Sequence, residues 1–290
     1  MTFESKKCII LHKDELGVIE IKIIEEFIKG KRPRQSECED GYVIKPQFVA
    51  VIDGVTAKGK HLWGDKHQSG CYAMMKIKEF LRGDVENLSA EELFSALSKY
   101  LLKAYKNELH EDVIEERLRA CIIIYNGIYN EIWSYGDCQC MIDGKIYKDD
   151  KEVDNIFSEK RIKIIEKKLE DGMTVEELLI NDVGRKAILE DVKEQFSYEN
   201  KICKLGYPVL NGDEIVPEMI KKISVPENAE IVLSSDGYPI LCDTLEKSEQ
   251  ELKRLIKEAE LEALRYYKAC KKIHTANFNN KKFSINDIAI

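Results

Sequence analysis

The sequence predicts an α+β fold in which antiparallel sheets pack together and helices lie outside them. Short β-rich runs dominate the first part and the middle of the chain, and helical stretches separate them. Two dipeptides, Asn126-Gly127 and Asp143-Gly144, are the strongest hairpin signals, and each joins neighbouring β-rich runs. Hairpins indicate antiparallel pairing rather than βαβ units, which favours sheets with helices grouped on their outer sides.

The first part of the chain is predicted to hold short strands followed by two helices. The apolar run that begins at Phe48 stops at Asp53-Gly54, which ends that strand. Ser89 with Glu92 three residues later has the pattern of a capping box, which predicts the start of a helix. The expected strands are residues 8–12, 18–23 and 48–52, and the expected helices are residues 70–81 and about 89–107.

The rest of the chain is predicted to contain an antiparallel meander, a helical region and a final strand. The meander comprises residues 120–125, 128–135, 139–142 and 145–148. Helices are expected over residues 152–200 and 245–272, and strands over residues 230–234 and 283–290. No internal repeat, low-complexity segment or Pro/Gly-rich linker occurs, which favours one domain over residues 1–290. Residues from about 149 to 200 are then a helical insert, a candidate flap beside an active site.

The composition limits the classes of partner. The 290 residues are 44% hydrophobic and carry a formal net charge of −8, and they contain no dense Lys/Arg tract, which argues against nucleic acid. No apolar run approaches the roughly 20 residues of a membrane span, and the N-terminus lacks a signal peptide pattern. The nine cysteines are scattered and odd in number, which favours reduced thiols and a cytoplasmic location. We interpret Cys138-Gln139-Cys140 as part of a strand rather than a zinc site.

Acidic residues recur at the predicted ends of strands, often beside a glycine. Carboxylates on rigid strand ends can converge on a hard cation such as Mg²⁺ or Mn²⁺, and a following glycine lets a backbone carbonyl approach it. Any one Asp-Gly pair alone is more simply a turn. The turns are Glu39-Asp40-Gly41, Asp53-Gly54, Gly136-Asp137 and Asp236-Gly237, with Asn286-Asp287 as a fifth candidate.

The order and flanking sequence of these turns resemble the protein phosphatase 2C (PPM) family. The segments VAVIDGVT, YGDCQC and VLSSDGYP, followed by the terminal SINDIAI, match its succession of motifs from about residue 36 to residue 290. The chain looks most like a bacterial branch with a DG.T.K motif, here Asp53 to Lys58, a GR helix at Gly184-Arg185 and an SDGYP segment. The resemblance implies a four-layer αββα sandwich with a two-metal cleft at one end of two central antiparallel sheets.

The resemblance also implies roles for individual residues. Asp53 would bridge two Mn²⁺ or Mg²⁺ ions, the Gly54 carbonyl would bind one of them and Asp236 the other. Glu39 would support the site directly or through water, and Asp137 with Asp236 would form a more labile third position. The implied reaction is metal-dependent hydrolysis of a phosphomonoester, with a metal-bridging hydroxide that attacks phosphorus in line. The implied substrate is phosphoserine or phosphothreonine on a protein.

The chain departs from the family pattern in three places. Gln35 occupies the position of the usual phosphate-gripping arginine, although neighbouring Arg34 could take that role. Asn286 occupies the position of the terminal aspartate ligand, and Asp287 would project to the opposite face of a strand. Val55 follows Asp53-Gly54 where many eukaryotic members have a histidine. We assign no catalytic role to the nearby His61 and His67.

Three readings of the sequence therefore stay open. The first is an active serine/threonine protein phosphatase. The second is a degenerate pseudophosphatase that binds a phosphorylated or regulatory partner without turnover, which Gln35 and Asn286 favour. The third is an acidic α+β domain whose Asp-Gly turns coincide with the motifs by chance. No cysteine has the Cys-x5-Arg pattern of a cysteine phosphatase, so a cysteine nucleophile is not expected.

Overall fold

The computed structural model describes residues 6–13, 21–30, 34–64, 66–149 and 151–272. The chain forms two compact units, each described by itself. The first comprises Met1–Lys151 and Tyr198–Ser248, and the second comprises Glu152–Ser197 and Glu249–Ile290. The expected strand over residues 283–290, with Asn286 and Asp287, lies outside the described residues. The single domain over residues 1–290 stays a prediction.

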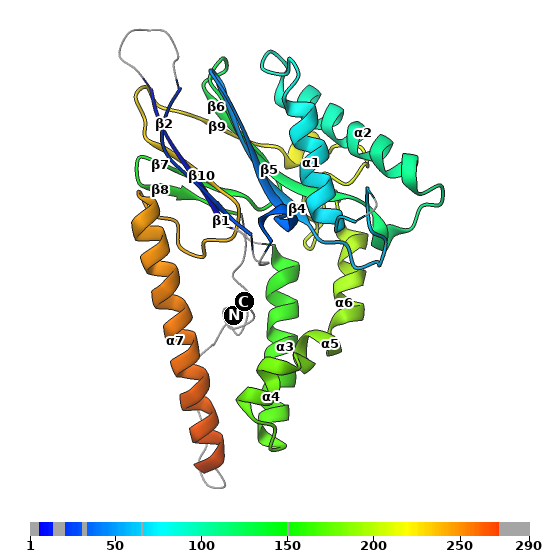
Figure 1. Ribbon diagram of the computed structural model, residues 1–290, viewed down its shortest axis with the longest axis vertical. Coiled ribbons are helices and arrows are strands. Elements are labelled where there is room, and N and C mark those ends of the chain that lie inside the picture. Colours follow the sequence, from blue (N-terminus) through cyan, green and yellow to red (C-terminus); the bar gives the residue numbers. More distant parts are fainter. Residues whose placement is uncertain (1–5, 14–20, 31–33, 65, 150, 273–290) are drawn as a thin grey trace. The chain divides into compact units, whose positions relative to one another are not determined.

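Two five-stranded antiparallel sheets form the first unit, which confirms the expected α+β class and its paired sheets (Figure 1). Sheet A has the order β2 (Ile21–Lys29), β1 (Lys6–Lys13), β10 (Ile231–Ser234), β7 (Gln139–Ile142) and β8 (Lys145–Tyr147). Sheet B has the order β3 (Asp40–Lys45), β4 (Phe48–Val55), β5 (Arg119–Asn126), β6 (Glu131–Tyr135) and β9 (Lys221–Ser224). Strand β10 of sheet A contacts β4 and β5 of sheet B, so the sheets pack face to face.

Two helices, α1 (Ser69–Leu81) and α2 (Ala90–Glu108), cover the outer face of sheet B (Figure 1). The capping box at the start of α2 is confirmed. The Ser89 backbone N–H donates to Oε2 of Glu92 over 2.9 Å, and the Glu92 N–H donates to Oγ of Ser89 over 3.3 Å. These bonds satisfy two backbone donors that the first turn of a helix would otherwise leave open.

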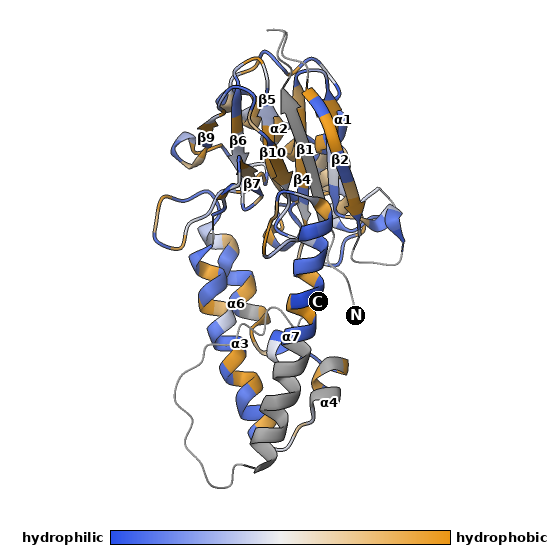
Figure 2. Cartoon of the chain, turned by 90° about the vertical axis from the view of Figure 1, so that its left-hand side faces the viewer, coloured by the Kyte–Doolittle hydropathy of each residue, from blue (hydrophilic) through white to orange (hydrophobic). Residues whose placement is uncertain are grey.

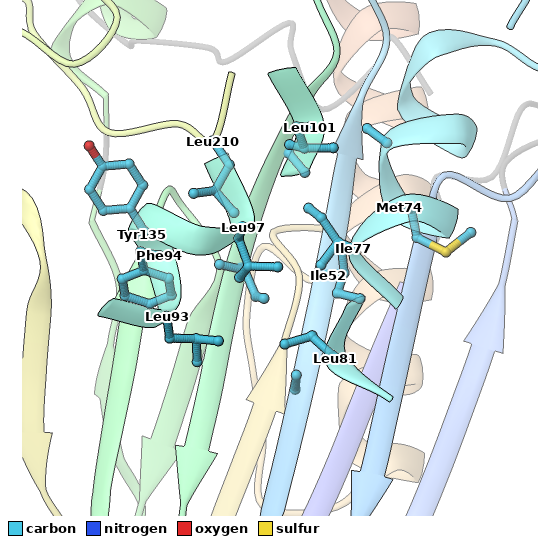
Figure 3. Packing of buried hydrophobic residues seen from close by; sticks show 14 of the residues in the cluster. Ile52, Met74, Ile77, Leu81, Leu93, Phe94, Leu97, Leu101, Tyr135 and Leu210 are labelled. Atoms are coloured by element: carbon cyan, nitrogen blue, oxygen red, sulfur yellow. The ribbon is translucent and has the colours of Figure 1, made fainter. Parts of the chain in front are cut away.

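The hydrophobic core lies between these helices and sheet B, with large side chains from both interlocking (Figure 3). Ile52, Ile122 and Ile124 face this core, and Met74 and Ile77 of α1 pack on them. The alternate residues of β4 and β5 are also buried, because they face sheet A. Burial on both faces explains why these strands are continuous apolar runs in the sequence.

The predicted single meander is wrong, because its strands lie in different sheets. Strands β5 and β6 pair in sheet B, whereas β7 pairs with β8 and β10 in sheet A. The chain crosses between sheets at Gly136, which has φ +125°, a conformation that side chains disfavour. A Cβ there would lie 2.3 Å from Cβ of Cys121, so only glycine fits. The hairpin between β7 and β8 is confirmed at Asp143-Gly144, where both residues have positive φ.

Two strands escape the sequence prediction, and a third has different bounds. The strand expected over residues 18–23 is found as β2 (Ile21–Lys29), and residues 18–20 lie outside the described residues. Strand β3 begins at Asp40, where the sequence motif predicts a turn, and β9 is a short edge strand rich in lysine. The predicted bounds 139–142 of β7 are confirmed. Short 3₁₀ helices occupy Gln35–Glu37, Ile114–Glu116, Gln195–Tyr198 and Pro217–Met219.

The second unit is helical, as expected. It contains α3 (Glu152–Glu170), α4 (Val175–Ile180), α5 (Val183–Ala187), α6 (Leu189–Glu194) and most of α7 (Leu245–Lys272). Hydrophobic and hydrophilic residues alternate around α3 (Figure 2). Gly184 of α5 packs on α3, because a Cβ there would lie 2.7 Å from Cγ1 of Ile165. None of the described helices is both long enough and apolar enough to cross a membrane.

Candidate metal centre

The first part of the site is a pair of aspartates on neighbouring strands of sheet B. Asp40 begins β3 and lies directly opposite Asp53, near the end of β4. Asp40 is 2% exposed, while Asp53 is partly buried. The Gly54 N–H donates to the backbone carbonyl of Glu39 over 3.0 Å, which extends the pairing of the two motifs. Antiparallel pairing thus brings together two acidic motifs that are 13 positions apart, from position 40 to position 53.

The start of helix α1 fixes the backbone around these motifs. A Cβ on Gly54 would lie 2.0 Å from the Gly70 carbonyl oxygen, and a Cβ on Gly70 would lie 3.0 Å from Oε1 of Glu39. Glycine at both positions therefore lets the helix approach the strand end closely. The Thr56 hydroxyl donates to Oε1 of Glu39, and Glu39 is only 3% exposed. The Glu39 side chain is consequently held between the Asp53-Gly54 segment and α1.

Sheet A contributes the second part of the site through the SDGYP segment after β10. The buried Ser235 hydroxyl donates to Oδ2 of Asp40 over 3.1 Å, which links the two sheets. Nε2 of Gln139 donates to the carbonyls of Ser235 and Tyr238, over 3.2 Å and 2.6 Å. These bonds fix the turn that carries Asp236, whose side chain is exposed. The accessible Asp236 therefore lies on the solvent side of a site whose deeper carboxylate is Asp40.

Like charge dominates the environment of Asp53. Burial raises its pKa well above the usual range, and the carboxylates of Asp40, Asp236 and Asp137 raise the pKa further. A hydrogen bond between Asp53 and Asp236 acts in the same direction. Three carboxylates from both sheets thus lie close enough to Asp53 to oppose its ionisation. A group of this kind favours a bound cation, which would relieve the repulsion.

Asp137 lies on the crossover between the sheets and forms an ion pair with Lys151. Its Oδ2 is 2.6 Å from Nζ of Lys151. Burial, the largest influence, acts to raise the pKa of Asp137, but the charge of Lys151 and the hydrogen bonds to the carboxylate together outweigh burial, so the pKa is lowered. Oδ1 of Asp137 is buried and has no hydrogen-bond partner among the described residues.

Two cysteines lie beside the carboxylates. Burial raises the pKa of Cys121 and of Cys138 well above the usual thiol range, and the nearby aspartates raise both further. Both side chains therefore stay neutral thiols at ordinary pH, which makes them poor nucleophiles. Among the cysteines whose side chains the structure describes, none forms a disulfide bond and only Cys203 is exposed.

The sequence-predicted site residues fall into three groups. Glu39, Asp53, Gly54, Asp137 and Asp236 lie on segments that meet at the strand ends. Arg34 has an 80% exposed side chain and lies 3.4 Å from Glu37, and Oε1 of Gln35 accepts from the Gly30 N–H over 3.0 Å. Asn286 and Asp287 lie outside the described residues.

Sequence reasoning missed two residues of the cluster. Asp40 lies within the Glu39-Asp40-Gly41 motif, and its place on a strand opposite Asp53 could have been inferred by pairing the two motifs. Lys151 has no local signal, because it is one lysine in a charged stretch before a helix. Its contact with Asp137 depends on the crossover between the sheets.

The donor set fits a hard divalent cation by its chemistry. Among the residues that the structure describes, no three His, Cys, Asp or Glu side chains converge in a geometry that could hold a metal ion. The charged side chains that act on the ionisation of Asp53 are nevertheless carboxylates, and Gly54 has no side chain that would shield its carbonyl. Oxygen donors of this kind suit Mg²⁺ and Mn²⁺ rather than zinc or copper.

No protein-family model and no curated protein matches the chain. Among solved structures, the chain is similar to the catalytic domain of the serine/threonine protein phosphatase PstP in complex with two manganese ions. The identity is 13% over 91% of this chain and 93% of that chain, with a TM-score of 0.39. It is similar, at the same identity and TM-score, to the Mycobacterium tuberculosis serine/threonine phosphatase PstP/Ppp, over 92% of this chain and 93% of that chain.

Proposed function

We propose that the protein is a metal-dependent phosphomonoester hydrolase of the protein phosphatase 2C type. The observation that supports this proposal most strongly is the carboxylate cluster around Asp53, to which Asp40, Asp137 and Asp236 contribute from both sheets. These residues come from the same motifs, in the same chain order, that resemble that family. The placement of these residues near one another supports this proposal over a chance coincidence of the motifs.

The proposed metal centre uses oxygen ligands from three segments. Asp53 and the Gly54 carbonyl would hold ions from sheet B, Asp236 would do so from sheet A, and Glu39 would support them directly or through water. When bound, a pair of Mn²⁺ or Mg²⁺ ions supplies a water molecule whose pKa is lowered toward neutrality and positive charge for the phosphoryl oxygens. We expect Asp53 and Asp236 to be indispensable for turnover.

The surrounding residues would orient these ligands. Ser235 donates to Asp40, and Thr56 donates to Glu39, so both acidic side chains are held by hydroxyl groups. Such outer hydrogen bonds fix the direction of a metal ligand and its partners. The neutral thiols of Cys121 and Cys138 take no covalent part in the proposed reaction.

The proposed substrate is phosphoserine or phosphothreonine on a protein partner, which follows from the resemblance of the motifs. The exposure of Asp236 fits a site that is open to a large substrate. The acidic charge of the chain argues against nucleic acid as a substrate. Free cysteines support a reducing, cytoplasmic location, and we propose no membrane partner.

A second candidate is a pseudophosphatase that binds a phosphorylated or regulatory protein without turnover. The observation that favours it is that Gln35 stands at the position of the usual phosphate-binding arginine. Its amide oxygen accepts a hydrogen bond from the Gly30 backbone N–H. Arg34 next to it has an exposed side chain near Glu37. Phosphate would then be held without the arginine that the family pattern supplies at this position.

Hydrolysis of para-nitrophenyl phosphate separates these candidates. The assay compares Mn²⁺, Mg²⁺ and EDTA, with the wild type, Asp53→Asn and Asp236→Asn. The matched control is Asp143→Asn, because Asp143 also precedes a glycine but lies in the β7–β8 turn, where asparagine tolerates its positive φ. We expect metal-dependent turnover in the wild type and the control, and a loss on the order of 100-fold or more in the two site variants. Absence of turnover in folded wild-type protein at every metal concentration would favour the pseudophosphatase.

A further inference from the structure

The ion pair between Lys151 and Asp137 adds a fixed positive charge to the carboxylate cluster. Nζ of Lys151 lies 2.6 Å from Oδ2 of Asp137, and the two side chains are only 17% and 16% exposed. Surface lysines usually make solvated and exchangeable pairs, which contribute little. This pair is mostly shielded from water and belongs to the site itself, so its charge acts on the neighbouring carboxylates with less screening.

An aromatic platform holds the ammonium group in place. Nζ of Lys151 lies 5.1 Å from the ring centroid of Tyr207, a cation–π distance. Tyr207 is buried, and its carbonyl accepts from the Asn200 N–H over 2.9 Å. Next to Asn200, the buried Glu199 pairs with Arg119 over 2.5 Å. The segment that carries the platform is therefore anchored to strand β5.

The position of this ammonium matters for metal binding at Asp137. A metal ion bound to Oδ2 would lie about 2.0–2.6 Å from that oxygen, and therefore no more than about 5 Å from the lysine nitrogen, which is 2.6 Å from the same oxygen. Two cations cannot share this position without strong repulsion. The other oxygen, Oδ1, is buried and accepts no hydrogen bond from the residues that the structure describes.

We propose that Lys151 takes the place of a third metal ion at Asp137, so that the centre works with two ions and a built-in ammonium group. This inference rests on the proposed function, because it assumes a metal centre at Asp53 and Asp236. The Lys151 ammonium group would occupy the place of the labile third ion that the family resemblance implies, and it is always present. The ammonium group stabilises the ionised Asp137 and supplies positive charge to the cluster without depending on metal concentration.

Isothermal titration of the metal-stripped protein with Mn²⁺ tests the proposal by counting ions, independently of turnover. The variants are Lys151→Met, which removes the charge, and Lys151→Arg, which keeps it. The matched control is Lys221→Met, because Lys221 also makes a 2.6 Å ion pair, with Asp149, in the same region but without contact to Asp137. Circular dichroism checks that each variant is folded. A phosphate-release assay over micromolar to millimolar Mn²⁺ follows the same proteins.

We expect two Mn²⁺ ions per chain in the wild type, in Lys151→Arg and in Lys221→Met. Lys151→Met should bind a third ion, more weakly, and should lose turnover at micromolar Mn²⁺ by about tenfold, with recovery at millimolar Mn²⁺. Three ions in the wild type, or an unchanged count and affinity in folded Lys151→Met, would overturn the role of Lys151. A wild type that binds no Mn²⁺ would instead overturn the proposed function itself.

Discussion

Asp40 on β3 and Asp53 on β4 are directly opposite each other in sheet B. Asp40 is buried, and the pKa of Asp53 is raised well above its usual range. Two adjacent carboxylates in a shielded place oppose folding unless something neutralises them. A protein that needs only stability would place apolar side chains at such a pair. The arrangement is consistent with the cation site that we propose, and several measurements test it.

The stability of the metal-free protein should fall as pH rises. The pKa of Asp53 is higher in the folded chain than its usual value, so the folded state holds this proton more tightly than the unfolded state does. The resulting stabilisation is complete below the unfolded pKa of about 3.9 and is lost as pH rises through the folded pKa. Asp137 has the opposite sign, but its window lies below about pH 4 because its pKa is lowered.

Thermal unfolding in EDTA between pH 4.5 and 7.5 measures this effect. We expect the melting temperature of the wild type to fall across this range, and Asp53→Asn to show a smaller fall. Addition of Mn²⁺ should raise the wild-type melting temperature most at the upper end, because metal and proton compete for the same carboxylate. Equal pH slopes in the two proteins would contradict the electrostatic picture of Asp53.

Gly70→Ala should damage both stability and turnover. The added Cβ would lie 2.5 Å from the Gly54 carbonyl oxygen and 3.0 Å from Oε1 of Glu39, so α1 must move away from the strand end. Overpacking of this kind costs about 1–3 kcal/mol, although alanine is otherwise the better helix former. Urea unfolding and phosphate release measure the two effects. The control is Gly83→Ala after α1, where the added Cβ would lie 3.3 Å from the Phe80 carbonyl oxygen, so a smaller loss of stability and little change in turnover are expected.

Thiol labelling should spare the cysteines beside the site. Cys121 and Cys138 are buried and have strongly raised pKa values, whereas Cys203 is exposed. Iodoacetamide at pH 7.5 should therefore modify Cys203 in the native protein and leave the other two intact, with turnover retained. Peptide mapping by mass spectrometry gives the sites. Rapid modification of Cys138 with loss of turnover would argue for a thiol in the chemistry.

Loss of Arg119 should destabilise the first unit strongly. Its guanidinium, 1% exposed, donates to Glu199 over 2.5 Å and to the carbonyls of Arg117 and Ile114 over 3.0 Å and 2.8 Å. Arg119→Met leaves a buried carboxylate without its charge partner, which costs about 3–5 kcal/mol. The double variant Arg119→Met with Glu199→Leu should recover part of this loss in urea unfolding. An unchanged unfolding midpoint in the single variant would show that water reaches the pair.

Much of the fold could be predicted because it is encoded locally. The capping box at Ser89 and the turn at Asp143-Gly144 each need only neighbouring residues, and both are confirmed. The sheet to which a strand belongs is not a local property. The crossover at Gly136 depends on close contact with Cys121 on another strand, so the predicted meander was wrong.

The same distinction applies to the site. The Asp-Gly motifs made Asp53, Asp137 and Asp236 candidates from the sequence, and these residues do affect one another electrostatically. The contact of Lys151 with Asp137 could not be predicted, because 14 positions and a change of partner strands separate them. Whether a lysine meets a carboxylate or solvent depends on packing that no short pattern contains.

The most direct test of the metal centre is phosphate release from a phosphothreonine peptide as a function of Mn²⁺ concentration, for the wild type and Asp53→Asn. We predict saturable, Mn²⁺-dependent release by the wild type, abolished by EDTA, and a loss on the order of 100-fold or more in the folded variant. Release that persists in EDTA, or that is equal in the two proteins, would contradict a metal centre built on Asp53.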